Sequence, residues 1–405
     1  MSAGERHLSG HPTLEPKPWR PSLQLAEVSY SLSTIWYERQ RFLPAILAVA
    51  FSAVLVAVQS GLVLGLLSMM SLPVDRATAD VWVGYPGVRS VDLGRPIPDR
   101  WVSRLAAHPE VERAETAVLG FAQWTRIENG SATATTEIVS VVGTRLDPHS
   151  LAAVEQVRTN PEILARLAEP RSIAVDEAEL GRLGVRGIGD TAEIVGVRVR
   201  VVALVKGCRS LGGPYVFCSI DTARAVLHYQ PGEATYLVAK CKSPADAWKV
   251  ARRMEGYPQL AAYTAEEFSA RSRLHWLTTT KAGIAMGFTA LLGLLVGAVV
   301  TSQTLYAATA ASQREYATLR AMGIPKWRLK LAVLIQSFWV GLFGVALAVP
   351  LTFALAELAD ALGTTVRLHP VVLGAAALVT MSMALGSGLA ALRSFGQVDP
   401  AHNIR

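Results

Sequence analysis

The sequence predicts an α-helical membrane protein with four transmembrane helices and a large extracytoplasmic α+β domain between the first and the second. Hydrophobic residues make up 51% of the chain and charged residues only 18%, whereas soluble domains contain about 25% charged residues. Four runs also lack acidic, lysine and arginine side chains, and each exceeds the roughly 20 residues that cross a bilayer. They are Phe42 to Val74, Ala282 to Gln313, Leu331 to Ala356 and Leu368 to Leu392.

Arginine and lysine are concentrated on one side of these runs. Five precede the first run (Arg6, Lys17, Arg20, Arg39 and Arg41), and five lie between the second and the third (Arg314, Arg320, Lys326, Arg328 and Lys330). The loop at 357–367 has only Arg367. Because basic loops stay in the cytoplasm, we expect both termini and the 314–330 loop to be cytoplasmic. The net charge of +7 then reflects topology rather than nucleic-acid binding, for which no recognition motif is present.

The two ends of the chain are predicted to be peripheral. Residues 1–22 are polar and proline-rich, which is typical of a disordered leader. Residues 23–41 carry apolar side chains at helical spacing and predict a helix lying on the cytoplasmic membrane surface. The alternative is a plain continuation of the first membrane helix. We expect residues 393–405 to form a cytoplasmic tail.

The segment at 75–275 has the pattern of a folded domain. Strand patterns occur at 79–85, 111–127, 137–144, 191–206, 234–240 and 259–264, and helical patterns at 98–108, 161–168 and 245–255. One β-α-β pattern lies at each end of the segment, and a valine-rich stretch lies between them. We expect the two ends to pair into one α+β unit with the β-rich middle inserted.

The loop between the second and third apolar runs contains a charged helical segment. Residues 314–322 read as a helix, Gly323 ends it, and Pro325 suits the first turn of the next helix. Leu319 and Met322 give it a small apolar face. We expect the segment to bind another protein through Arg314, Glu315, Tyr316, Leu319, Arg320, Met322 and Gly323. The alternative is a solvated loop whose basic residues only set the topology.

The sequence offers no catalytic or metal-binding motif. It lacks a phosphate-binding Gly-x-x-x-x-Gly-Lys-Ser/Thr, a His-Glu-x-x-His and a Gly-x-Ser-x-Gly, and its eight histidines are scattered. We therefore expect no catalytic residue, no metal and no cofactor on this chain. The apolar runs also lack the ionisable residues that ion-coupled transporters place within the membrane.

Glycine pairs and cysteines suggest two structural contacts. Gly61 and Gly65, Gly283 and Gly287, and Gly293 and Gly297 each have GxxxG spacing, which lets helix backbones approach closely. We expect them to pack helices together in a dimer. All three cysteines fall in the 75–275 segment. Cys208 and Cys218 bracket a Gly-Gly-Pro turn that is compatible with a disulfide; buried free thiols are the alternative.

With one span, a large domain and three further spans, the chain resembles the FtsX-like, MacB-type (type VII) permeases of ABC transporters. The stretches Ser302 to Thr309 and Arg314 to Gly323 are similar to the DevC branch, and Asp399-Pro400-Ala401 resembles a common ending of the family. The resemblance is specific over 302–330 and looser in the large domain.

The resemblance implies a non-catalytic homodimer in the bacterial inner membrane, with an ABC ATPase that carries ATP and Mg²⁺ docked at 314–323. It implies stalks at 42–74 and 276–313, and a porter-like part plus an inserted β-rich part in the periplasm. It also implies transmission of ATP-driven motion, and a periplasmic adaptor and an outer-membrane channel for exporting lipid or other hydrophobic cargo. The alternatives are an FtsX-like regulator of cell-wall hydrolases and a membrane sensor with an external ligand-binding domain.

Overall fold

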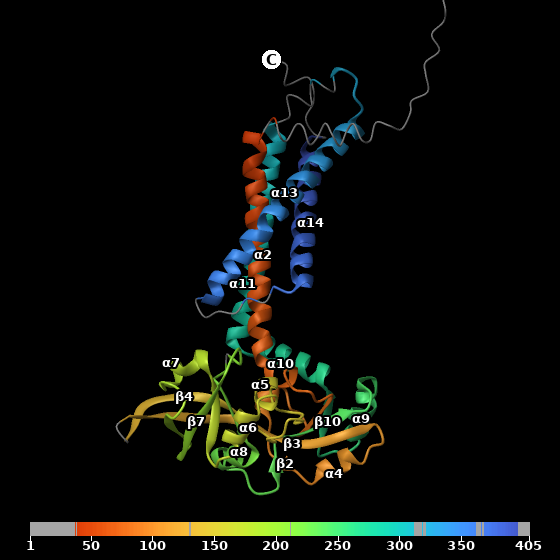
Figure 1. Ribbon diagram of the computed structural model, residues 1–405. Helices are drawn as coiled ribbons and strands as arrows, with labels where there is room; N and C mark the ends of the chain where they lie inside the picture. The colour runs from red at the N-terminus through yellow and green to blue at the C-terminus, as the bar shows by residue number, and fades with distance from the viewer. Residues whose placement is uncertain are drawn as a thin grey trace, which may run out of the picture. The chain divides into compact units, whose positions relative to one another are not determined.

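The computed structural model describes residues 37, 39–128, 131–210, 212–311, 318, 321–361, 366 and 368–395. The predicted leader (1–22), most of the predicted surface helix (23–41) and the tail beyond residue 395 lie outside the described residues. Within the described part, four helices are long and apolar enough to cross a membrane. They are α2 (Arg39–Met70), α11 (Lys281–Ala311), α13 (Lys326–Ala361) and α14 (Pro370–Phe395) (Figure 1). The four predicted membrane helices are therefore confirmed.

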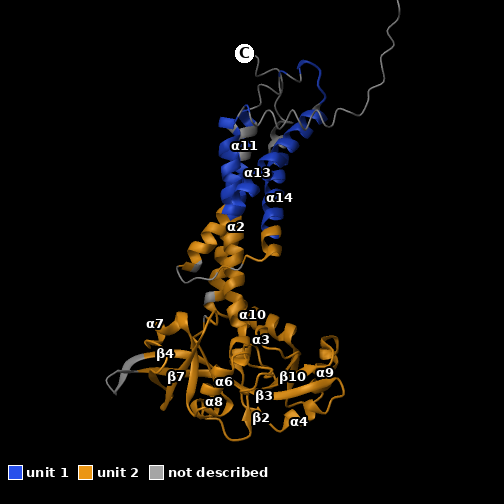
Figure 2. Cartoon of the chain, viewed as in Figure 1, with its two compact units in different colours: residues 1–54, 296–350, 375–405 blue, residues 55–295, 351–374 orange. Residues whose placement is uncertain are grey.

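The chain divides into two compact units, which are coloured separately in Figure 2. The first comprises residues 1–54, 296–350 and 375–405, and most of its described part consists of segments of the four long helices. Phe42, Val49 and Val340 belong to its small apolar cluster. A Cβ placed on Gly344 would lie 2.6 Å from Val49 Cγ1. Since small residues let helices pack closely in lipid, Gly344 permits the contact between α13 and α2.

The second unit (55–295 and 351–374) contains the domain between the first two spans, which we call the interspan domain (residues 71–280). Its main sheet has nine strands in the order β11-β1-β10-β3-β4-β8-β5-β7-β6. Their bounds are β1 (Val81–Gly84), β3 (Val111–Glu128), β4 (Ser131–Thr144), β5 (Ser172–Asp176), β6 (Thr191–Ile194), β7 (Val197–Val205), β8 (Tyr215–Ser219), β10 (Tyr236–Cys241) and β11 (Ala261–Thr264). The short strands β2 (Ile97–Pro98) and β9 (Glu233–Ala234) pair separately.

The inserted part of the interspan domain is a closed ring of six strands. The order β3-β4-β8-β5-β7-β6 returns to its start because β6 also pairs with β3, with Trp124 opposite Ile194. The indole nitrogen of Trp124 donates to the carbonyl oxygen of Leu183 in the short helix α7 (Leu180–Leu183) at 3.0 Å. A closed ring leaves no unpaired strand edge, which explains how the short strands β5 and β6 remain paired on both sides.

Strand β3 is shared by both parts of the domain. Its first half pairs with β10, from Val111 to Ala117, and its second half pairs with β4 from Val118 onward. Helices α4 (Trp101–Ala106) and α9 (Ala247–Glu255) contribute Leu105 and Met254 to the apolar cluster on one face of the sheet. Helix α10 (Ala265–Thr279) contributes Phe268 to the cluster on the opposite face.

The remaining short elements connect these strands. They are α3 (Leu72–Asp75), α5 (Glu155–Arg158), α6 (Pro161–Leu167), α8 (Ile220–Leu227) and the 3₁₀ turns η1 (Val91–Leu93), η2 (Glu177–Glu179) and η3 (Pro244–Asp246). The expectation that the two ends of the segment pair around an inserted middle is confirmed by the pairing of β1 with β10 and β11. The sequence prediction omitted β8 and α8. The N-cap of α8 is Ser219, whose side chain accepts the Thr222 amide.

The suggested disulfide is not formed, because Cys208, Cys218 and Cys241 are all buried free thiols. Cys218 lies on β8 in the cluster that includes Val216, whereas Cys208 belongs to the cluster on the other face, with Tyr215 and Phe217. The alternation of side chains along β8 therefore points the Cys218 thiol away from Cys208. Burial raises the pKa of the Cys208 thiol to about 11, so it is also a poor nucleophile at neutral pH.

Candidate functional site at the stalk junction

The stalk helices, defined here as residues 55–70 of α2 and 281–295 of α11, meet the interspan domain at α3 and α10. Ser71 interrupts the helix after α2, and Pro73 lies in the first turn of α3, where the missing N–H costs no helical bond. Helix α10 starts at a capping box, in which Thr264 accepts from the Glu267 amide and Glu267 accepts from the Thr264 amide. Local sequence signals thus place the two short helices next to the stalk.

Asp75 ties α3 to α10. One carboxylate oxygen accepts from the Ser269 hydroxyl at 2.6 Å. The other accepts from the Ser71 hydroxyl at 2.7 Å and from Arg273 Nη2 at 2.5 Å. Arg273 Nε also donates to the Ser71 hydroxyl at 2.8 Å. We call these four residues, Ser71, Asp75, Ser269 and Arg273, the clasp. Since both serines are buried, removing the carboxylate would leave them without their hydrogen-bond acceptor.

Helix α10 is also bonded to the loop that contains η1. The Val91 amide donates to the Ser272 hydroxyl at 3.0 Å, and Arg271 Nε donates to the Val88 carbonyl at 2.9 Å. Phe268 anchors the same helix in the core, where it packs against Trp82 with ring centroids 6.0 Å apart. Helix α10 therefore belongs mechanically to the interspan domain rather than to the stalk.

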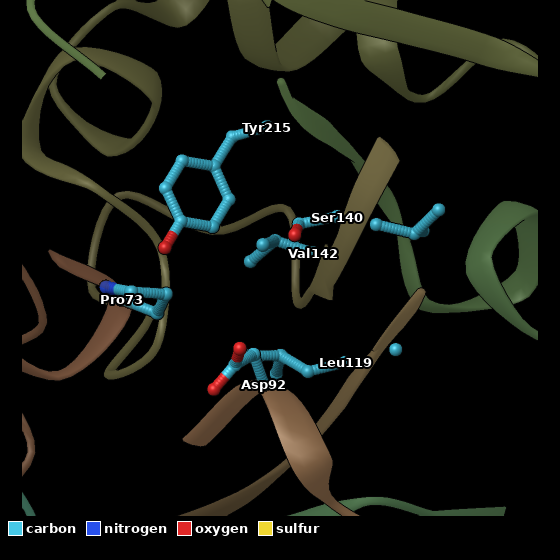
Figure 3. A pocket seen from close by; sticks show the side chains of 8 residues that line it. Pro73, Asp92, Leu119, Ser140, Val142 and Tyr215 are labelled. Atoms are coloured by element: carbon cyan, nitrogen blue, oxygen red, sulfur yellow. The ribbon is translucent and has the colours of Figure 1, made fainter. Parts of the chain in front are cut away.

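A small cavity lies behind this contact, lined by Pro73 and Asp92 and by residues of β3, β4 and β8, including Leu119, Ser140 and Tyr215 (Figure 3). The Asp92 carboxylate accepts from the hydroxyl of Ser90 and from Trp276 Nε1, the latter at 3.3 Å. Burial raises the pKa of the Asp92 carboxyl above its ordinary value of 3.8, although the bonds from Ser90 and Trp276 oppose the shift.

Strand β8 and the loop before it contact the ends of α2 and α3. The Tyr215 hydroxyl donates to the Met69 carbonyl at 3.0 Å, and Arg76 Nη2 donates to the Gly207 carbonyl at 3.0 Å. The Cys208 amide donates to Asp176 at 2.5 Å. Burial raises the pKa of the Tyr215 hydroxyl, so Tyr215 stays a neutral donor. The stalk end of α2 is thus bonded to the six-stranded ring as well as to α10.

These contacts are structural connections between elements of the chain. Among the described residues, no three His, Cys, Asp or Glu side chains are placed to hold a metal ion. Charged and neutral hydrogen bonds connect one folded domain to α2 and α11, two membrane helices that are far apart in the sequence. The sequence analysis missed Asp75, Asp92, Arg273 and Trp276. The available signal was the clustering of Ser, Asp and Arg directly after the first apolar run and before the second.

Most of the predicted coupling residues lie outside the described part of the chain. These are Arg314, Glu315, Tyr316, Leu319 and Arg320. Met322 is described and is 68% exposed. Gly323 has a φ of +92°, a left-handed conformation that favours glycine and ends the preceding helical turn. The predicted stop at Gly323 is therefore confirmed, while protein binding by the segment stays a prediction.

The glycine pairs have different surroundings. A Cβ on Gly293 would lie 3.4 Å from Gln59 Cγ, and one on Gly297 would lie 3.3 Å from Ser52 Cβ. These two glycines therefore pack against α2 of the same chain, and their packing in a dimer stays a prediction. Gly61 and Gly65 are buried within α2.

Within this chain, the nearest atoms to a Cβ on Gly283 or Gly287 belong to α10 rather than to a neighbouring membrane helix, so the expected packing of this pair in a dimer stays a prediction. A Cβ on Gly283 would lie 2.0 Å from the Trp276 carbonyl oxygen, whereas one on Gly287 would meet only Leu277 Cδ1, at 3.9 Å. Gly283 accommodates a close backbone approach within its own segment, and Gly287 does not.

Comparisons with known proteins agree with this architecture. Residues 42–257 match the family model of the MacB-like periplasmic core domain, and residues 287–400 match that of the FtsX-like permease C-terminal region. A comparison with curated proteins finds no match.

Two solved structures are similar. The periplasmic region of MacB from Actinobacillus actinomycetemcomitans is 9% identical with a TM-score of 0.32, and the match covers 51% of this chain and 97% of that one. The extracellular domain of the noncanonic ABC-type transporter YknZ from Gram-positive bacteria is 8% identical with a TM-score of 0.31, covering 46% and 99%. The family assignment depends on the two family models, one of which spans more than half of the chain. The chain is a multi-pass membrane protein that belongs to the FtsX/MacB-type (type VII) family of ABC transporter permeases, whose members work with an ABC ATPase.

Proposed function

We propose that this chain is the non-catalytic membrane subunit of an exporter and that it passes ATP-driven motion of a separate ATPase to its periplasmic domain. ATP and Mg²⁺ bind to the partner ATPase and not to this chain. The observation that carries the proposal is the junction. The end of α2 is bonded to the domain through Tyr215, and α11 directly follows α10, which Arg273 and Trp276 hold in the domain. A domain attached in this way follows the helices when they move.

The proposed route of motion begins at the segment 314–323. The distribution of basic residues around the membrane runs favours a cytoplasmic position for this segment and both termini, on the side where an ABC ATPase hydrolyses ATP. Helix α11 ends at Ala311, just before the segment, and starts at Lys281, just after the junction. A force applied to the segment is therefore delivered along one helix to the interspan domain.

The working assembly that we propose is a homodimer with a periplasmic adaptor and an outer-membrane channel in a bacterial inner membrane. The similarity of residues 302–323 to the DevC branch favours lipid or another hydrophobic compound as cargo. The same reasoning assigns the function to mechanical transmission without a channel through the spans. Neighbouring genes for an ATPase and an adaptor would support this assembly over a regulator of cell-wall hydrolases.

The proposal is tested by co-purification with the ATPase. Glu315→Lys and Leu319→Asp each change the predicted docking face, so both variants should insert normally but lose ATPase binding and export. Glu357→Lys is the matched control. It makes the same charge reversal at an exposed position of α13, on the predicted external side. Normal ATPase binding and normal export in both docking variants would mean that the ATPase binds elsewhere on the chain and would contradict the proposed route.

A further inference from the structure

Helices α10 and α11 are separated by a sharp bend at Thr280. Its φ of −90° and ψ of 145° are extended, so the helical hydrogen-bond ladder is interrupted at this residue. The Thr280 hydroxyl compensates on both sides. It donates to the Trp276 carbonyl at 2.6 Å, near the end of α10, and accepts from the Gly283 amide at 3.0 Å, in the first turn of α11. Thr280 therefore caps α11 in the manner of an N-cap threonine.

The bend brings the first turn of α11 unusually close to the last turn of α10. A Cβ on Gly283 would lie 2.0 Å from the Trp276 carbonyl oxygen and 2.7 Å from Leu277 Cα. Both of these are backbone atoms, which cannot move aside as the end of a side chain can. The observed bend is consequently possible only with glycine at this position.

The two helices that meet here belong to different parts of the protein. Helix α10 is held in the interspan domain by Ser272, Arg271 and Phe268. Helix α11 continues into a membrane-spanning stretch that starts at Gly283. The bend therefore sets the direction in which this span leaves the domain. Since the span's own hydrogen bonds start at Thr280, the capping hydroxyl also fixes where the rigid part of α11 begins.

We propose that Thr280 and Gly283 form an elbow, a pair of positioning residues that sets and preserves the angle between α11 and the interspan domain. This role depends on the transmission mechanism proposed above. In that mechanism, the elbow is the point where movement of the second span is transmitted to α10. The clasp, which directly follows α2, forms a second connection. The orientation of the domain relative to the stalk helices therefore depends on both the elbow and the clasp.

The elbow is tested first without any partner, on the full-length chain in lipid nanodiscs. Spin labels are placed at Ser103→Cys in α4 and Thr289→Cys in α11, both of which are exposed. The three native cysteines are buried, and a chain without added cysteines serves as the labelling blank. The distance distribution should shift by at least about 1 Å in Gly283→Ala, because Cβ atoms do not approach backbone atoms as closely as 2.0 Å.

The matched control is Gly287→Ala, whose Cβ has room and which should leave the distribution unchanged. Both variants replace a helical glycine with alanine and gain the same helix propensity, so a role in helix stability alone predicts the same result for both. An unchanged distribution in Gly283→Ala would overturn the elbow. Should Gly283→Ala fail to fold, Thr280→Val replaces it, with Thr280→Ser as the conservative variant that restores the wild-type distances.

The second arm adds the partner ATPase and ATP. Wild type, Gly287→Ala and Thr280→Ser should show a nucleotide-dependent change in the same distance, whereas Gly283→Ala and Thr280→Val should lose most of it. If wild type shows no such change although the ATPase hydrolyses ATP, the proposed function is refuted. The measurement without the partner still tests the geometry of the elbow in that case. If Gly283→Ala responds to ATP like wild type, the elbow is refuted and the proposed function stands.

Discussion

Replacing Asp75 with alanine should release α10 from α3. The carboxylate accepts two serine hydroxyls and one guanidinium, and the hydroxyls of Ser71 and Ser269 are buried. Each hydroxyl that loses its acceptor costs about 1 kcal/mol or slightly more. In the ion pair, the Arg273 side chain is 40% exposed and that of Asp75 is 29% exposed. Solvent screening therefore limits the contribution of this pair to at most about 1 kcal/mol. The sum is about 2–4 kcal/mol of local stability.

Hydrogen–deuterium exchange measures this loss directly. Because every 1.4 kcal/mol is a factor of ten, amides of α10 that exchange through local opening should lose roughly 30- to 700-fold of their protection. Amides of β5, which is buried along its whole length, provide the internal reference. Glu162→Ala is the control variant, since it removes a 2.7 Å ion pair with Arg166 in which Glu162 is 73% and Arg166 45% exposed. That variant should change protection by only about twofold.

The result that would refute this reasoning is equal protection of α10 in Asp75→Ala and in Glu162→Ala. In that case the clasp would contribute no more than a surface ion pair, and the other contacts of α10, among them those of Phe268 and Ser272, would be enough to hold it. A loss of protection spread over the whole interspan domain would instead mean that the domain unfolds as one unit.

Two further predictions concern the cavity and the membrane helices. Burial raises the folded-state pKa of Asp92 above 3.8, so the folded chain holds this proton to higher pH than the unfolded chain does, and stability falls as pH rises from 3.8 through the raised pKa. At pH values above the raised pKa, Asp92→Asn should therefore have a higher thermal midpoint than wild type, and below pH 3.8 the two midpoints should be equal. A midpoint lower than that of wild type at every pH would contradict the prediction. Gly297→Leu should destabilise the chain in detergent by about 1–3 kcal/mol through overpacking against Ser52, whereas Gly374→Leu, where a Cβ meets nothing within 4 Å, should not.

Much of the fold was predictable because its signals are local. Uncharged runs longer than a bilayer define the spans, and the alternating valines at 197, 199 and 201 define strand β7. Strand β8 was missed because Tyr215 to Cys218 is a short apolar run after a Gly-Gly-Pro turn, and such runs have no periodicity of their own. The closed ring was also unpredictable, since the pairing of β6 with β3 joins residues about 70 positions apart.

The candidate site was harder to predict than the fold. Asp75 and Arg273 are almost two hundred residues apart, and no spacing rule connects them. The glycine motif does not by itself identify the contact that each glycine makes. Spacing of four residues marks one face of a helix, but it does not show whether that face meets a neighbouring helix, as at Gly297, or a backbone bend, as at Gly283. The positive-φ stop at Gly323 was predictable because its cause is local.

The central claim is that ATP-driven motion reaches the interspan domain. The most direct test labels Trp248→Cys, an exposed position on α9, in both copies of the proposed dimer, with the partner ATPase present. The distance between the two labels should differ between the nucleotide-free state and a state trapped with a non-hydrolysable ATP analogue, and Asp75→Ala should reduce the difference. The same distance in both states, in an assembly that hydrolyses ATP normally, would contradict the account.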